Sequence, residues 1–264
     1  MRVLGLDVGS RTVDAVWLED GAAAESAVLD AGFAPQEVAA ELVARRPVDR
    51  VVATGYGRHA AAERFGADVI TEIGAYALGA SRLFPEARSI LDIGGQDTKV
   101  ILFAAGGKVA DFEMNDKCAA GTGRFLEVMA RAFGVDVGEM AEEAIAADGS
   151  VAVSSMCTVF AESEVIGLLH RGEPRARIAR GLHEAVVRRT LSSLHRVRAR
   201  PPLVFAGGGA RNAALVELVA AGIGGHVLVA PDPQTVGALG AALYGAALRG
   251  AAPLHQQAPE KEDI

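Results

Sequence analysis

The chain has 264 residues, half of them hydrophobic, and a formal net charge of −7 at pH 7. This length suffices for one large or two small domains with real cores, and the acidic balance argues against non-specific binding to nucleic acid, which needs a basic surface. No apolar run reaches the roughly 18 residues of a membrane span without charges or glycines, and the N-terminal segment lacks the features of a signal peptide. We therefore expect a cytoplasmic protein that does not enter a membrane.

The first part of the chain has the pattern of strands joined by tight turns. The apolar run RVLGLDV ends at Gly9 and Ser10, and the alternating segment TVDAVWLED follows, which is typical of two paired strands. Further along, the sequence predicts a helix at 35–46, a strand at 48–54 and a helix at 72–84.

The opening pattern then occurs a second time. LDVGS at 6–10 matches LDIGG at 91–95, so that Asp7 aligns with Asp92 and the glycine two positions later is repeated. Each copy is followed by a strand-like segment, TVDAVWL in the first and DTKVILF in the second. Such an internal duplication predicts two similar lobes in an α/β protein.

The second half of the chain is expected to be mostly helical. The predicted helices lie near 122–133, 136–147, 159–170 and 174–197, and a strand at 202–206 precedes a glycine triplet and another helix. Pro233 is suited to open a last helix that packs through small residues. The predicted organisation is a first lobe at 1–88, a second lobe at 89–250 and a loose polar tail at 251–264.

Basic residues gather between Arg171 and Arg200. The simplest interpretation of such a run is a solvated helix face, and docking of an acidic partner is the alternative.

Both D-x-G turns have the features of phosphate-binding loops. A glycine at the end of a strand lets the backbone approach an anion, and the N–H groups of the turn then point at phosphate oxygens. A carboxylate beside phosphate implies a cation, for which hydrated Mg²⁺ is suited. A single turn of this kind could be an ordinary hairpin, whereas two copies favour phosphate binding.

A third glycine-rich turn, FAGGGARN, follows the strand at 202–206. Its glycines would let the backbone lie flat against a base or a ribose, and Arg211 and Asn212 can cap the next helix. The alternative is a tight connection between a strand and a helix.

The chain has only two cysteines, Cys118 and Cys157, and each precedes a run with helical spacing. The N-terminus of a helix carries partial positive charge and free N–H groups, which favour a thiolate or an anionic group. Two thiols cannot complete a four-ligand metal site within one chain. Alternatives are two buried cysteines that act as small hydrophobic side chains and a catalytic thiol, although neither motif contains a histidine to act as base.

The six histidines show no spacing typical of metal ligands. We interpret them as surface or helix-cap residues.

Together these motifs resemble the actin/Hsp70/sugar-kinase ATPase superfamily. Within it, ATGYGR, LDIGGQDTKVI, NDKCAAGTGRFLEVMA and CTVFAESEVI are similar to the activator ATPases of 2-hydroxyacyl-CoA dehydratases and to the related ATPase subunits of benzoyl-CoA reductase. The resemblance covers about residues 2–247. It implies a duplicated ATPase fold, with two lobes around a nucleotide cleft, and a homodimer that holds one [4Fe–4S] cluster between its protomers and couples ATP hydrolysis to one-electron transfer.

The resemblance also implies roles for individual residues. Cys118 and Cys157 match the cluster ligands, Asp7 and Asp92 match the acidic residues near Mg²⁺ and its waters, and Gln96 stands where a water-positioning group is expected. The remaining positions match nucleotide contacts: Gly9, Ser10, Arg11 and Thr12 in the first phosphate loop, Gly94, Gly95, Gln96 and Asp97 in the second, Gly207, Gly208 and Gly209 in the nucleotide turn, and Gln234 in the segment that closes over the nucleotide.

Two positions depart from the family pattern. Asp14 stands where family members commonly have a lysine, so one positive charge near the phosphates is missing. Tyr76 stands where a histidine is common.

The expected function is that of a homodimeric ATPase that takes electrons from a reduced ferredoxin or flavodoxin. It would pass them singly, at low potential, to a 2-hydroxyacyl-CoA dehydratase or a related acyl-CoA reductase. Alternatives are an ATPase subunit of a benzoyl-CoA reductase-type complex, a small-molecule kinase of the same superfamily with Asp97 as base, and a non-catalytic ATP-dependent sensor. The short tail favours the stand-alone activator.

Overall fold

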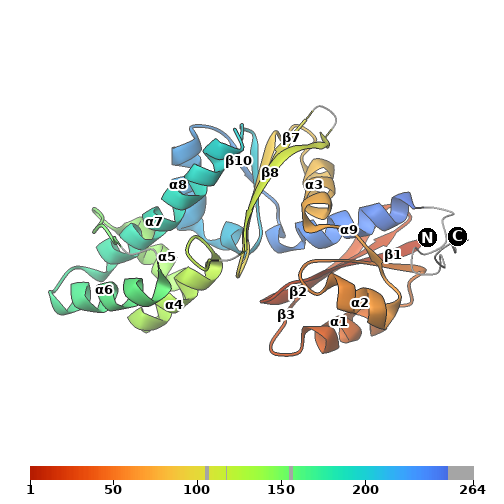
Figure 1. Ribbon diagram of the computed structural model, residues 1–264, viewed down its shortest axis with the longest axis horizontal. Helices are drawn as coiled ribbons and strands as arrows, with labels where there is room; N and C mark the ends of the chain where they lie inside the picture. The colour runs from red at the N-terminus through yellow and green to blue at the C-terminus, as the bar shows by residue number, and fades with distance from the viewer. Residues whose placement is uncertain (105–106, 117, 155–156, 249–264) are drawn as a thin grey trace, which may run out of the picture. The chain divides into compact units, whose positions relative to one another are not determined.

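The computed structural model forms two compact units, each built on a five-stranded mixed sheet (Figure 1). One unit comprises Met1–Leu83 with Gln234–Ile264, and the other comprises Phe84–Pro233. The structure describes residues 1–104, 107–116, 118–154 and 157–248, so the expected tail at 251–264 lies outside the described residues. In the described part, no helix is long and apolar enough to cross a membrane.

The first unit holds the strands in the order β3-β2-β1-β4-β5, with β1 antiparallel to β2 and parallel to β4. The strands are β1 (Arg2–Val8), β2 (Thr12–Glu19), β3 (Ala22–Asp30), β4 (Arg50–Thr54) and β5 (Asp68–Val69). The helices are α1 (Pro35–Ala44), α2 (Arg58–Phe65), α3 (Glu72–Leu83) and α9 (Val236–Ala247).

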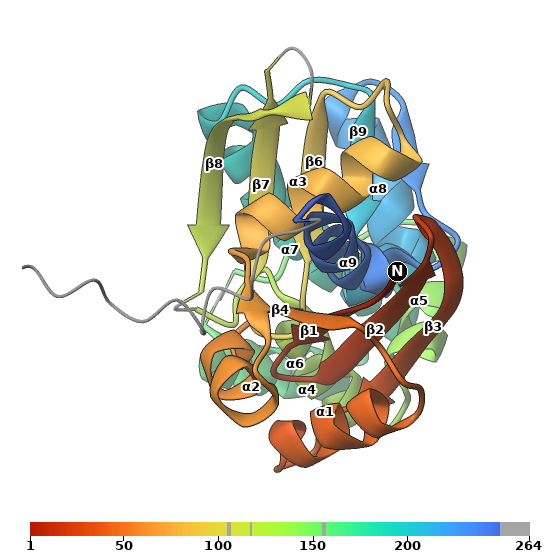
Figure 2. The ribbon, with the colours of Figure 1, turned by 90° about the vertical axis from the view of Figure 1, so that its right-hand side faces the viewer.

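Helices cover both faces of this sheet. Figure 2 shows α1 and α2 on one side of the strands and α9 on the other. Because both faces are covered, β1 is buried along nearly its whole length, which explains its continuous apolar run in place of an alternating pattern.

Helix α9 packs on the first sheet, which differs from the sequence-based division that placed 236–247 in the second lobe. Its small residues allow close contact with the strands and with α3. A Cβ atom added at Gly5 would lie 2.0 Å from the Ala238 carbonyl oxygen, and one added at Gly240 would lie 1.7 Å from the Ala75 carbonyl oxygen. The chain therefore returns to the first unit at its end, a long-range contact that local sequence patterns do not reveal.

The second unit has the strand order β10-β9-β6-β7-β8. Its strands are β6 (Ser89–Ile93), β7 (Thr98–Phe103), β8 (Val109–Asn115), β9 (Leu203–Ala206) and β10 (Val227–Val229). Its helices are α4 (Gly123–Phe133), α5 (Val137–Ala146), α6 (Thr158–His170), α7 (Arg175–Arg196) and α8 (Ala213–Ile223), with a short 3-10 helix, η2, at Gly208–Arg211.

The two sheets have the same topology, as the internal duplication predicts. β8-β7-β6-β9-β10 repeats β3-β2-β1-β4-β5, and the cross-strand pair Asp7–Asp14 has its counterpart in Asp92–Lys99. The hairpin turns also match, since the Gly9 and Gly94 N–H groups each donate over 3.0 Å to the carbonyl oxygen three residues later. The predicted fold, a duplicated α/β ATPase fold of the actin type, is confirmed.

Strands β3 and β8 and helix α2 were not among the predicted elements. β3 and β8 are sheet edges with mainly exposed or half-buried side chains, and β3 is rich in alanine, which has a low strand preference. Pairing with β2 and β7 outweighs that preference. Helix α2 has one buried residue, Ala61, and so shows little apolar periodicity.

His183 lies in the core of the second unit, so its interpretation as a surface or cap residue is wrong. It is fully buried on α7, with Nδ1 2.8 Å from the Ala179 carbonyl oxygen and Nε2 3.0 Å from Nδ2 of Asn212. Because a carbonyl oxygen only accepts, Nδ1 carries the proton and Nε2 accepts from the Asn212 amide. Asn212 in turn accepts from the Leu215 N–H and caps α8, as the sequence predicts.

The contact between α3 and α9 depends on Gly240. We expect Gly240→Ala to destabilise the protein by about 2 kcal/mol, because its Cβ would meet the backbone of α3 and force the helices apart. Gly167→Ala in α6 is the matched control, since its Cβ would meet only the Arg171 guanidinium at 3.5 Å. That change should be neutral or stabilise by about 0.5–1 kcal/mol. Urea unfolding of both variants measures their free energies of unfolding. Equal changes in the two variants would contradict the close packing of α9 on α3 at Gly240.

Burial lowers the pKa of His183, so its protonation opposes folding. As the pH falls below about 6.5, His183 binds a proton in the unfolded chain but stays neutral in the folded chain. The free energy of unfolding should therefore be higher above pH 6.5 and fall on acidification, by at most about 1.4 kcal/mol per pH unit from this group. His183→Gln should lose less stability between pH 7.5 and 5.5 than the unmodified chain in urea unfolding. Identical pH dependences would contradict this assignment.

Candidate functional site

The first glycine turn lies beside two buried carboxylates. Asp7 in β1 is paired with Asp14 in β2, and each residue is 6% exposed. Directly paired residues of antiparallel strands project from the same face of a sheet, so the two side chains are neighbours. Thr12 Oγ1 donates to Asp14 Oδ2 over 3.2 Å.

The second glycine turn has a lysine at the corresponding place. Lys99 is buried, and its Nζ lies 3.0 Å from Asp92 Oδ2 and 2.7 Å from Asp97 Oδ2. Lys99 was not among the predicted site residues, although alignment of the two copies places it opposite Asp14. The second turn therefore carries an internal cation, whereas the first presents two carboxylates.

A second glycine touches the aspartate in each unit. Gly55 follows β4 and Gly207 follows β9, with φ angles of +84° and +76°. A Cβ at Gly55 would lie 2.4 Å from Asp7 Oδ1, and one at Gly207 would lie 2.1 Å from Asp92 Oδ1. Only glycine fits both the backbone angle and the close approach. The ATGYGR motif is thus the first-unit counterpart of the glycine triplet. This is a third repeated feature, and it was not among the repeats predicted from the sequence.

Asp14 and Tyr76, the two positions expected to depart from the family pattern, both lie beside Asp7. A Cβ added at Gly237 would lie 2.3 Å from Asp7 Oδ2 and 2.7 Å from Cε2 of Tyr76. Tyr76 is buried at this place, and Asp14 is the cross-strand partner of Asp7. Both residues therefore belong to the surroundings of one carboxylate.

Several predicted nucleotide contacts lie together within their own unit. In the first unit Gly9, Ser10, Arg11 and Thr12 form the hairpin turn between β1 and β2, and the second unit has Gly94, Gly95, Gln96 and Asp97 between β6 and β7. Gln96 and Gly208 are exposed, and a Cβ at Gly208 would meet no atom within 4 Å. Gln234 belongs to the first unit, next in the chain to Pro233, whose carbonyl oxygen accepts from the Gly207 N–H.

The loop that carries Cys118 is held by two neighbouring strands. Thr98 and Asn115 form a cross-strand pair of β7 and β8. Thr98 Oγ1 donates to the Gly121 carbonyl oxygen over 2.8 Å, and Asn115 Nδ2 donates to the Cys118 carbonyl oxygen over 2.9 Å. These contacts fix the loop backbone on both sides of its turn.

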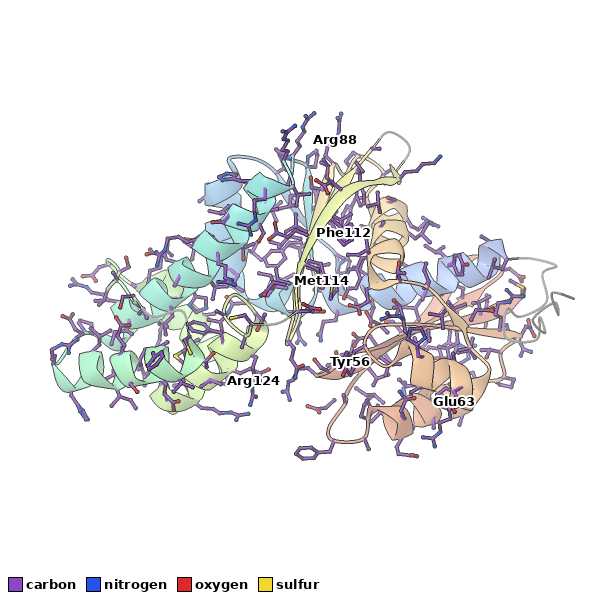
Figure 3. The ribbon with its side chains drawn as sticks, in the orientation of Figure 1. Tyr56, Glu63, Arg88, Phe112, Met114 and Arg124 are labelled. Carbon is purple, nitrogen blue, oxygen red and sulfur yellow. The ribbon has the colours of Figure 1, made fainter. Side chains whose placement is uncertain are left out.

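The start of α4 is bonded directly to the second glycine turn. The Gly123 N–H donates to the Gly94 carbonyl oxygen and the Arg124 N–H to the Gly95 carbonyl oxygen, both over 2.9 Å. Figure 3 labels Arg124 on α4 and Met114 on β8, the elements that flank the Cys118 loop. Free N–H groups at the start of this helix were expected to favour the thiolate, but these two join α4 to the predicted phosphate loop.

Both thiols are free and exposed, so the interpretation of the cysteines as buried hydrophobic residues is wrong. Cys157 is the N-cap residue of α6 and its carbonyl oxygen accepts from the Ala161 N–H over 2.8 Å. Helices α4 and α6, which follow the two cysteines, pack against each other. Within the described ranges, no group of three or more His, Cys, Asp or Glu side chains could hold a metal ion.

Two large apolar side chains are exposed next to Cys157. Val159 and Phe160, in the first turn of α6, are 68% and 67% exposed. Neighbouring exposed apolar side chains of this size are a feature of surfaces that another chain covers.

The chain is similar to proteins of known activity over nearly its whole length. It is 45% identical over 254 residues to the activator of lactoyl-CoA dehydratase from Anaerotignum propionicum, covering 92% of this chain and 97% of the relative. It is 36% identical over 205 residues to a subunit of benzoyl-CoA reductase from Thauera aromatica, covering 75% of this chain and 72% of the relative.

Solved structures show the same fold. The activator of the 2-hydroxyisocaproyl-CoA dehydratase from Clostridium difficile, with bound ADPNP, superposes with a TM-score of 0.85 at 40% identity, covering 92% of this chain and 94% of the other. A glucokinase of the ROK family from Streptomyces griseus shares the fold alone, with a TM-score of 0.56 at 14% identity, and covers 92% and 98% of the two chains.

The family model described as the BadF/BadG/BcrA/BcrD ATPase family matches residues 4–245. The chain belongs to this ATPase family, within which its relatives include activators of 2-hydroxyacyl-CoA dehydratases.

Proposed function

We propose that the chain is an ATP-hydrolysing activator that delivers single electrons to a 2-hydroxyacyl-CoA dehydratase. One observation carries this proposal: the second glycine turn, a phosphate loop by its pattern, is hydrogen-bonded through Gly94 and Gly95 to the start of α4. Cys118 lies five residues before that helix. A change in the loop therefore acts directly on the thiol-bearing segment.

The glycine turns support binding of ATP with Mg²⁺. The related activator holds ADPNP, and we propose that Gly9–Thr12 and Gly94–Asp97 bind the phosphates, with Gly207–Gly209 and Gln234 at the rest of the nucleotide. Carboxylate oxygens are ligands that Mg²⁺ prefers, so Asp7 and Asp92 fit a role at the ion and its waters. Gln96 is exposed at its turn, where it can orient the attacking water.

The thiols support a shared iron–sulfur cluster. Each chain has two cysteines, both exposed, and a [4Fe–4S] cluster takes four thiolates, so two chains would hold one cluster. When bound, the cluster would supply a carrier for one electron at low potential. Thr98 and Asn115 fix the backbone around Cys118, which would orient that ligand.

The apolar surface beside Cys157 supports a homodimer. Val159 and Phe160 would be covered when two chains approach each other around their thiols. A two-fold axis through a shared cluster makes the same patch meet itself, as is usual in symmetric dimers.

The remaining partners follow from the relatives' names and from the chemistry. Activators of lactoyl-CoA and 2-hydroxyisocaproyl-CoA dehydratases are among the relatives, which favours a dehydratase as electron acceptor. A reduced ferredoxin or flavodoxin would be the donor. The benzoyl-CoA reductase subunit has lower identity, so an ATPase subunit of such a complex is the second candidate. A kinase is less favoured, because its expected base, Asp97, is bonded to Lys99.

Iron content and nucleotide binding should separate in variants. Cys118→Ala should lose the cluster iron, measured by iron analysis after anaerobic purification, and still bind ADPNP, because the glycine turns are unchanged. Gln96→Ala is the reciprocal control, which should retain the iron while hydrolysing ATP at least about tenfold more slowly. Full iron content in Cys118→Ala, or iron-free unmodified protein, would contradict the cluster.

The surface beside Cys157 should control association of the chains. We expect Phe160→Glu to give a folded monomer that lacks iron, because the side chain is exposed and adds little to the core. Phe112→Glu is the matched control: Phe112 is 53% exposed on β8, and this variant should remain a dimer. Light scattering gives the mass, and a dimeric Phe160→Glu protein would contradict the proposed surface.

A further inference from the structure

A cavity of about 600 Å3 lies in the second unit, between α7 and the segments that lead to the two cysteines. The end of β8 forms one wall and continues to Cys118, and residues 153–154 form another and continue toward Cys157. The lining residues are Glu113, Met114, Asn115, Val153, Ser154, Ala185, Arg188, Arg189, Ser192, Ser193 and Arg196.

The cavity lining is basic although the whole chain is acidic. It contains three arginines and one glutamate, which leaves a formal excess of two positive charges. All three arginines lie on α7, within the basic run for which a solvated helix face and docking of an acidic partner are the two interpretations. These three arginines line the cavity, whereas the other arginines of α7 do not.

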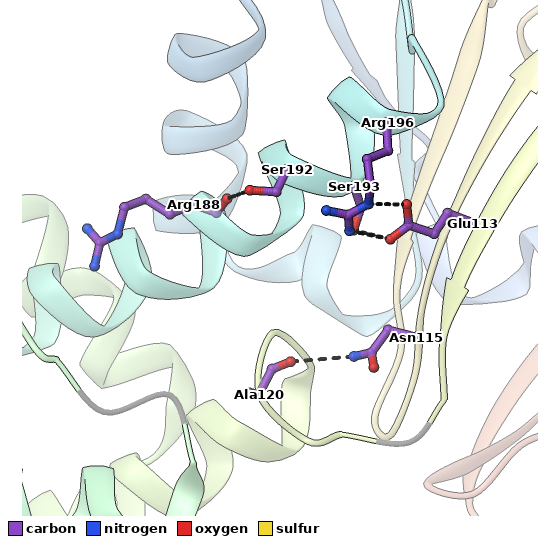
Figure 4. A network of polar contacts seen from close by, with 7 residues as sticks. All are labelled: Glu113, Asn115, Ala120, Arg188, Ser192, Ser193 and Arg196. Atoms are coloured by element: carbon purple, nitrogen blue, oxygen red, sulfur yellow. Dashed lines mark hydrogen bonds and ion pairs between the residues drawn. The ribbon is translucent and has the colours of Figure 1, made fainter.

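Arg196 and Glu113 form a fixed part of the lining. Arg196 Nε donates to Glu113 Oε2 over 2.6 Å, and Ser193 Oγ donates to Glu113 Oε1 over 2.8 Å. Figure 4 shows this pair bridging β8 and α7. The Arg196 guanidinium lowers the pKa of Glu113, so the carboxylate stays charged and Arg196 is largely neutralised.

Arg188 and Arg189 are the other two cations of the lining, and Arg188 is held only by a long ion pair. Arg188 is 4.0 Å from Glu184, and its side chain is 58% exposed. Among the described residues, no carboxylate lies within 4.0 Å of the Arg189 guanidinium, although its charge acts on Glu113 from further away.

Arg189 also contacts the Cys118 loop. A Cβ added at Gly121 would lie 2.9 Å from Arg189 Cδ, so the side chain of the arginine runs across this turn. Any anion held by Arg189 is therefore adjacent to the backbone between Cys118 and α4.

We propose that this cavity binds a phosphate dianion, either free or as the phosphate group of a small molecule, through Arg188 and Arg189. Two guanidinium groups match the charge and the oxygen geometry of phosphate, and the volume is within the roughly 300–1,000 Å3 of small-molecule sites. The bound anion joins both cysteine-bearing segments to α7 and so restrains them. This site is separate from the glycine turns and does not depend on the proposed electron transfer.

Calorimetric titration of the full chain at low salt tests this proposal, with inorganic phosphate and coenzyme A as the two probes. We expect saturable binding, weakened at least about tenfold by Arg189→Gln and also by Arg188→Gln. Arg175→Gln is the control, since Arg175 lies on α7 outside the cavity and pairs with Glu143; it should bind normally. A tighter complex with coenzyme A assigns the site to an organic phosphate, and equal affinities assign it to the free ion.

Hydrogen exchange tests the proposed restraint. The bound probe should slow exchange at 118–122 and 151–154 in the unmodified chain and leave Arg189→Gln unchanged. Binding that is absent, or that falls equally in Arg175→Gln and Arg189→Gln, would overturn the proposal, as would capture of an acidic protein in place of either probe. Unfolding curves of both variants confirm that they are folded before they are compared.

Discussion

Two backbone hydrogen bonds hold together the features on which this protein depends. The N–H groups of Gly123 and Arg124 donate to the carbonyl oxygens of Gly94 and Gly95. The first N–H groups of a helix have no partner within the helix, so an external acceptor is needed. Here the acceptor is a turn whose pattern is that of a phosphate loop. The helix that follows Cys118 therefore cannot shift without disturbing that turn, and the reverse holds as well.

The hydrogen bonds of β7 and β8 extend this link into a closed network. Thr98 follows the second glycine turn directly and holds the Gly121 carbonyl oxygen, while its cross-strand partner Asn115 holds the Cys118 carbonyl oxygen. The turn, the cysteine loop and the start of α4 are thus attached to the same two strands. A ligand-dependent change in the turn would be passed on through short, directional contacts, which suits the proposed coupling of nucleotide state to electron transfer.

The duplication also shows where the two units differ. Both have an aspartate at the end of the first strand, a glycine hairpin turn and a glycine against the carboxylate after the neighbouring parallel strand. The cross-strand partner is Lys99 in one unit and Asp14 in the other. In the second unit a buried lysine lies against Asp92, whereas in the first a second carboxylate stands opposite Asp7.

Much of the fold could be predicted from the sequence, because the repeated D-x-G pattern and the strand–turn–strand segments are local signals. The return of α9 to the first sheet could not, because it depends on close packing at Gly5 and Gly240, far apart in the chain. Lys99 and His183 were missed for a similar reason. A lysine in a strand and a histidine in a helix give no local sign that tertiary contacts bury them. The thiols were found from their motifs, but the acceptors for the first N–H groups of α4 come from a turn about thirty residues earlier, visible only in the fold.

Amide hydrogen exchange at Gly123 and Arg124, compared with ADPNP and with ADP, tests the coupling of the nucleotide loop to the cysteine loop most directly. If the second glycine turn transmits the nucleotide state, exchange at these two amides and across 118–126 will differ between the two nucleotides. Protection confined to 94–97, with the same exchange across 118–126 in both nucleotide states, would show that the loop and the thiol-bearing segment are not coupled.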